Sequence, residues 1–120
     1  LAALGFEPLD LGTDSSASVD YPDFADRLAG ALKDGRAKRG VLICGTGIGI
    51  SIAANRHRHV RAAVVHDVTS ARLTRLHNNA NVLCLGARLT GTDVAKDCLN
   101  VFLTTDFEGG RHQNRVAKLG

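Results

Sequence analysis

Residues 41–55 constrain the fold of this chain more than any other stretch: VLIC, then GTGIG, then ISIAAN. Four apolar residues in succession are typical of a strand buried on both faces, as in a parallel sheet. Glycines allow a tight turn and let backbone N–H groups face a ligand without a Cβ atom in the way. A helix that starts there directs its unpaired N–H groups to the same place. The pattern therefore predicts a pocket for an anion, with the thiol of Cys44 at its edge.

Two other interpretations of this stretch have to be considered. Gly45, Gly47 and Gly49 resemble part of the dinucleotide-binding fingerprint, but the third glycine comes one residue too early. No P-loop lysine follows, so nucleotide binding is disfavoured. The remaining alternative is a glycine-rich connection between a strand and a helix, with a buried and inert cysteine.

Composition excludes several classes of protein. The 120 residues, 44% hydrophobic and 22% charged, are ordinary for one globular domain covering residues 1–120. A net charge of +3, no lysine or arginine block, and an aromatic content of four phenylalanines and one tyrosine argue against nucleic acid binding. No apolar stretch approaches the roughly 20 residues that span a membrane. Three cysteines without a C-x-x-C spacing indicate a reducing, cytoplasmic environment.

Predicted strands alternate with predicted helices along the chain. Apolar runs predict strands at 6–11, 39–44, 60–66 and 81–86. Helix signals predict helices from 21 to Gly35, over 48–55, over 67–79, from a cap at Thr92 or Asp93, and after a turn at 107–110. This order predicts a right-handed α/β sandwich with a parallel sheet. Ligands bind at the carboxyl ends of such strands, the edge that collects Cys44, residues 66–67 and residues 86–88.

Several other polar residues admit more than one role when taken alone. Residues 56–59 are basic and predict a solvated loop. A metal site is disfavoured there, since no carboxylate or thiol lies nearby in sequence to complete it. Tyr21 is a helix-start packing residue or a substrate contact. His77 is a helix-end residue or a functional one. Arg111 and Arg115 are four residues apart, so they share a helix face that is either solvated or suited to phosphate. We expect Cys84 and Cys98 to be core residues, and His66 and Asp67 to have either a structural role or a role supporting the site residues.

Taken together, six motifs resemble the ribose-5-phosphate isomerase B family, which also includes the galactose-6-phosphate isomerase subunits. The motifs are DYP at 20–22, CGTGIGISIAAN at 44–55, HN at 77–78, NVL at 81–83, GAR at 86–88 and EGGRH at 108–112. Their order and spacing are specific, and the resemblance covers essentially the whole chain.

The resemblance implies a Rossmann-like three-layer α/β/α fold and an aldose–ketose isomerase that needs no metal and no other cofactor. Cys44 would move a proton between C1 and C2 of the sugar, Thr46 would assist as a proton donor, and His77 would open the sugar ring. Backbone amides would hold the enediolate oxygens at Gly45, Gly47, Ile48 and Gly49. Side chains expected to bind the substrate are Tyr21, Asn78, Arg88, Arg111 and Arg115, the last two on the phosphate.

The resemblance also implies a homodimer or a dimer of dimers whose sites cross the interface, with His77 and Arg88 reaching into the partner's site. The substrate would be ribose 5-phosphate, in exchange with ribulose 5-phosphate. The alternatives are a hexose 6-phosphate of the allose or galactose type, or a protein that binds sugar phosphates without turnover. No nucleic acid or membrane partner is expected.

The sequence departs from the family pattern at its front. Family members begin with a strand carrying an Asp-His pair, followed by a helix, whereas residues 1–5 here read as the last turn of that helix. From mean element lengths, the expected loss is on the order of 20 residues. The missing strand would leave unpaired edges on both of its neighbours.

Overall fold

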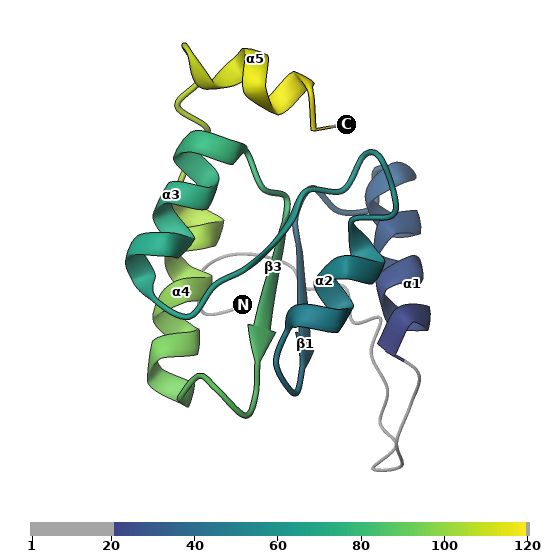
Figure 1. Ribbon diagram of the computed structural model, residues 1–120, viewed down its shortest axis with the longest axis vertical. Helices are drawn as coiled ribbons and strands as arrows, with labels where there is room; N and C mark the ends of the chain where they lie inside the picture. Colours follow the sequence, from purple (N-terminus) through teal and green to yellow (C-terminus); the bar gives the residue numbers. More distant parts are fainter. Residues whose placement is uncertain (1–20, 120) are drawn as a thin grey trace.

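The computed structural model describes residues 21–119, and the strand predicted at 6–11 lies outside them. Helices and strands alternate as predicted (Figure 1). The elements are α1 (Tyr21–Lys33), β1 (Gly40–Cys44), α2 (Ile48–Ala54), β2 (Ala62–Val64), α3 (Val68–Asn78), β3 (Val82–Gly86), α4 (Thr92–Thr104) and α5 (His112–Ala117).

The described strands form one parallel sheet in the order β1-β3-β2. β3 is the central strand, and all five of its residues are buried. Helices α1 and α2 lie on one side of the sheet and α3 and α4 on the other (Figure 1). The predicted three-layer α/β/α sandwich is therefore confirmed.

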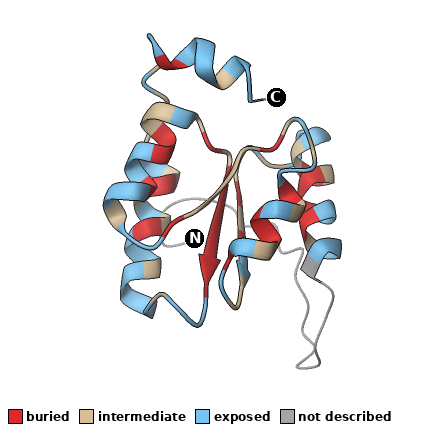
Figure 2. Ribbon diagram, viewed as in Figure 1, coloured by how far each residue is buried: buried red, intermediate tan, exposed pale blue. Residues whose placement is uncertain are grey.

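The core has two halves, because successive side chains of a strand point to opposite faces of the sheet. Val82 and Cys84 of β3 pack against the side covered by α1 and α2. Leu83 and Leu85 pack against the side covered by α3 and α4, together with Phe102, which is fully buried. Figure 2 shows the buried residues along β3 and on the helix faces turned toward it.

Local sequence signals fix two helix ends as predicted. Gly35 has a φ of 75°, and Arg36 N–H donates to Ala31 O at 3.0 Å, which satisfies a carbonyl left open at the end of α1. Asp67 caps α3, because its carboxylate accepts the Ser70 N–H at 2.6 Å.

Two predicted boundaries are wrong. The strand predicted from 60 to 66 is only Ala62–Val64, and its three residues are half-buried. It starts late because the Val60 N–H donates to His57 O in the preceding turn and the Arg61 N–H donates to the Asn81 side chain. The cap of α4 is Gly91 rather than Thr92 or Asp93. Gly91 has extended backbone angles and makes no side-chain capping bond, so α4 starts from backbone geometry alone.

Among residues 21–119, no helix combines the length and the apolar character needed to cross a bilayer.

Candidate active site

The glycine loop and the end of β3 meet at the carboxyl edge of the sheet, as predicted. Cys44 ends β1 opposite Gly86 of β3. Two further bonds join the segments beyond the strands: Ala87 N–H donates to Cys44 O at 2.8 Å, and Arg88 N–H donates to Gly45 O at 3.0 Å. The loop after β1 and the loop after β3 are therefore held as one unit.

The thiol of Cys44 is held against the glycine loop. Gly47 N–H donates to Cys44 Sγ across 3.1 Å, and the side chain is half-buried. Gly47 has a φ of 80°, and a Cβ there would lie 3.0 Å from the carbonyl carbon of Leu85. Only glycine fits this turn without strain, so this residue type is what brings the amide to the sulfur.

Thr46, in the same loop, is exposed. Its Oγ1 accepts the Ile48 N–H at 3.2 Å. Two of the predicted amide donors thus already have an acceptor: the Gly47 N–H donates to Cys44 Sγ and the Ile48 N–H donates to Thr46 Oγ1. Gly49 lies in the first turn of α2, where helix geometry leaves N–H groups without an intrahelical partner.

Close packing explains the glycine at position 86. A Cβ at Gly86 would lie 2.6 Å from the carbonyl carbon and oxygen of Thr46, closer than real Cβ atoms approach. Arg88 lies over the other side of the loop, with its Nε 3.4 Å from where a Cβ on Gly45 would be. Its guanidinium therefore lies beside the glycine loop of its own chain, and its contact with a partner's site stays an expectation from the family resemblance.

The other two thiols are core residues, as predicted. Cys84 and Cys98 are both fully buried. Burial, and secondarily the neighbouring Cys44, raises the pKa of Cys84 to about 12, and burial raises the pKa of Cys98. Of the three cysteines in the chain, Cys44 alone is not fully buried.

His66 and Asp67 make structural contacts at the same edge, as predicted. His66 Nδ1 lies 3.3 Å from Thr90 Oγ1, which links the loops that follow β2 and β3. The Ser70 N–H and hydroxyl both bond the Asp67 carboxylate and hold its pKa below the usual range.

A second group of predicted site residues gathers where α3 meets α5. His77 and Asn78 end α3, Arg111 precedes α5 directly, and Arg115 lies within it with its side chain exposed. The connection is fixed by the Glu108 N–H, which donates to Leu76 O at 3.1 Å.

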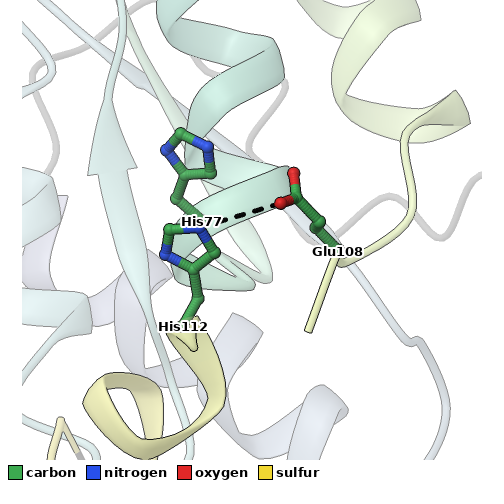
Figure 3. Close-up of side chains that lie close together, drawn as sticks. All are labelled: His77, Glu108 and His112. Atoms are coloured by element: carbon green, nitrogen blue, oxygen red, sulfur yellow. Dashed lines mark ion pairs between the residues drawn. The ribbon is translucent and has the colours of Figure 1, made fainter. Parts of the chain in front are cut away.

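Sequence analysis missed His112, which lies between the two arginines. Its ring stacks on that of His77, with centroids 4.3 Å apart and planes 16° from parallel. Glu108 Oε1 lies 3.9 Å from His112 Nε2 (Figure 3). Burial, then His77 and Arg111, lower the pKa of His112. The available signal was the spacing from Glu108 to His112 across two glycines.

The group around Cys44 and the group around His77 lie at opposite ends of the sheet. α3 ends at Asn78 and β3 begins at Val82, so His77 lies at the amino ends of the strands. Cys44 lies at their carboxyl ends, and Figure 1 shows α5 at the far end of the molecule from the strand arrowheads. Within residues 21–119, then, the structure does not bring His77, Asn78, Arg111 or Arg115 to Cys44. The side chain of Tyr21 lies outside the described residues.

Comparison with known proteins identifies the family. The model of the ribose/galactose isomerase family matches residues 1–119. The chain therefore belongs to this family of sugar-phosphate isomerases, as the motifs predicted.

Individual relatives agree with the family match. Ribose-5-phosphate isomerase B of Escherichia coli is 47% identical over 116 residues, which cover 97% of this chain and 78% of that protein. The structure of ribose-5-phosphate isomerase B from Clostridium thermocellum superposes with a TM-score of 0.96 at 50% identity, covering 99% of this chain and 80% of that one. The enzyme of the same name from Mycoplasma genitalium, solved with bound ribulose 5-phosphate, superposes with a TM-score of 0.92 at 43% identity over 98% and 79% of the two chains.

Proposed function

We propose that this chain interconverts ribose 5-phosphate and ribulose 5-phosphate through an enediolate, with Cys44 as the base. The observation that carries the proposal is the sulfur of the half-buried Cys44, which accepts the Gly47 N–H across 3.1 Å at the end of β1. A relative with 43% identity was solved with bound ribulose 5-phosphate, which supports the choice of a pentose phosphate.

The reaction requires a proton to move between two neighbouring carbons. The Cys44 thiolate takes the proton from C2 of the open-chain aldose and returns it to C1, while the oxygens of C1 and C2 exchange a proton with Thr46. Backbone amides of residues 45–49 stabilise the enediolate oxygens. The Ile48 N–H becomes a donor to substrate when Thr46 Oγ1 leaves it for its own proton-transfer role. A positioned acid or base typically contributes 10²–10⁴-fold and one oxyanion donor about 10²–10³-fold, so no metal is needed for a useful rate.

The ring-opening and phosphate-binding groups belong to the cluster at α3 and α5. His77 transfers a proton to the ring oxygen, and Arg111 and Arg115 bind the phosphate through paired N–H donors. Because this cluster and Cys44 lie at opposite ends of one chain, we infer a homodimer in which each site takes Cys44 from one copy and His77 from the other. Isologous contact between two copies produces two such sites.

The first experiment tests the base. We expect Cys44→Ser to lose at least about a hundredfold in turnover of ribose 5-phosphate, the lower range for a positioned base. Cys98→Ala is the matched control, since it removes a thiol that α4 buries in the core, away from the glycine loop. An unchanged rate in Cys44→Ser would remove this residue from the mechanism. Four- and six-carbon aldose phosphates assayed in parallel test the pentose preference, and faster turnover of a hexose 6-phosphate would contradict it.

The second experiment tests the shared site. Cys44→Ser and His77→Ala are each expected to be inactive, but mixed dimers keep one intact site out of two. Random exchange of equal amounts should restore about a quarter of the unmutated rate, since half the dimers are mixed and half their sites are whole. If native mass spectrometry shows mixed dimers and no activity returns, the site is not shared in this way.

A further inference from the structure

The cluster of His77, Glu108 and His112 has a feature that sugar isomerisation does not require. One candidate ligand atom from each of the three side chains lies within 4.8 Å of the others. In Figure 3 the two imidazole rings lie one over the other, and the carboxylate approaches them from the side. Two imidazoles and a carboxylate are a donor set that binds zinc and similar transition metals, and not magnesium or calcium.

One atom of the cluster has no partner. His112 Nε2 is buried and makes no hydrogen bond within residues 21–119, and the His112 side chain is only 7% exposed. Buried polar atoms are nearly always satisfied, so an exception points to a missing ion, water or ligand. Glu108 Oε1 lies 3.9 Å from this nitrogen, which is too long for a hydrogen bond.

The backbone holds these side chains in place. Gly109 and Gly110 have φ values of 76° and 59°, which fold the chain back so that Glu108 and His112 face each other. His112 N–H donates to Gly109 O at 3.2 Å, and Glu108 N–H is bonded to α3 next to His77. Ligand atoms about 2.0–2.2 Å from a tetrahedral zinc are about 3.4 Å apart. To bind one ion, the exposed Glu108 side chain must move by about an ångström and one of the two stacked rings must turn, because the lone pairs of parallel rings do not converge on one point.

We propose that His77, Glu108 and His112 form an inhibitory binding site for a divalent transition-metal ion such as Zn²⁺. Three protein ligands leave a fourth position open, as in zinc sites that also bind water or an anion. Arg111 and Arg115 lie close by and favour an anion in that position. The bound metal occupies the lone pair of His77 and so removes the group that opens the sugar ring. The inhibitory role rests on the proposed isomerase function, whereas metal binding itself does not.

Cobalt titration of the full chain tests the site directly, because Co²⁺ replaces Zn²⁺ and reports its ligands in the visible spectrum. We expect one equivalent to bind with nitrogen and oxygen ligands and to be displaced by Zn²⁺. Glu108→Gln and His112→Ala should each weaken binding by at least about tenfold, the lower end of the loss seen even for groups outside the first ligand shell. His57→Ala is the control, since this histidine pairs with Asp26 elsewhere on the surface.

Glu108 is exposed, so Glu108→Gln tests the ligand role without disturbing the core. Absence of binding, or equal binding in wild type, Glu108→Gln and His112→Ala, would overturn the site. A thiolate-to-cobalt charge-transfer band would also overturn it, because the metal would then lie on a cysteine.

The rate with and without saturating Zn²⁺ tests the inhibitory role. We expect at least about a tenfold loss in wild type and a smaller loss in Glu108→Gln at the same free zinc concentration. A saturated site with an unchanged rate would refute inhibition. If the chain has no isomerase activity at all, the proposed function and the inhibitory role fall together, while the cobalt spectrum still decides whether the metal site exists.

Discussion

The contact between Gly86 and the glycine loop allows a prediction whose size follows from distances. In Gly86→Ala, the new Cβ would lie 2.6 Å from the carbonyl carbon and oxygen of Thr46, whereas ordinary contact begins at 3.4 Å. The loop that carries Thr46 must therefore retreat by about 0.8 Å, the difference between these distances. Both partners are backbone, so no side-chain rotation can relieve the overlap.

Two effects of this displacement can be measured. Overpacking typically costs about 1–3 kcal/mol of unfolding free energy. A misplacement of about 1 Å can cost roughly a hundredfold in rate, so we expect a loss of that order in kcat/KM for ribose 5-phosphate. Urea unfolding and the isomerase assay check the two numbers separately.

The matched control introduces the same methyl group in open space. Gly30 lies inside α1 with nothing within 4 Å of its Cβ position, so Gly30→Ala should raise helix stability by about 0.5–1 kcal/mol and leave the rate unchanged. The reasoning is refuted if Gly86→Ala keeps full activity and full stability. In that case the glycine loop either yields without cost or does not position the reacting groups.

Three further predictions follow from the buried groups and from a helix cap. Alkylation at neutral pH should modify Cys44 alone in the native protein. Cys84 and Cys98 are buried, and their raised pKa values keep them as thiols. Early labelling of Cys84, detected by peptide mass spectrometry, would contradict this. Arg75→Ala should lower the unfolding free energy by about 2–5 kcal/mol in a denaturant titration, since this buried guanidinium donates to Thr105 O at 2.9 Å and Ala80 O at 2.6 Å and both would lose their partner. Asp67→Ala should lower the melting temperature at neutral pH. The difference should shrink as the pH falls below about 4 and through the lowered pKa of Asp67, because the charge-dependent part of the stabilisation is lost when the carboxylate is protonated. An equal difference at all pH values would show that the charge of the cap does not matter.

Local patterns determined most of the described fold. Alternation of apolar runs with helix signals gave the element order from 21 to 119, and Gly35 and Asp67 marked helix ends because they act through their own backbone and nearest neighbours. The errors came where distant groups compete. Asn81, twenty residues away in sequence, takes the N–H of Arg61 and shortens β2, which no window of sequence around β2 reveals.

The sequence by itself determined the family and the chemistry of the glycine loop, because a strand, a cysteine and three closely spaced glycines form one local unit. Only the tertiary structure decided which residues meet. It placed Arg88 over the loop of its own chain, stacked His112 on His77, and put that pair at the amino ends of the strands, away from Cys44. The physical reason is that a helix connecting two parallel strands must run antiparallel to them. Its last residues therefore lie at the amino ends of the strands, opposite the carboxyl end of the strand that precedes it.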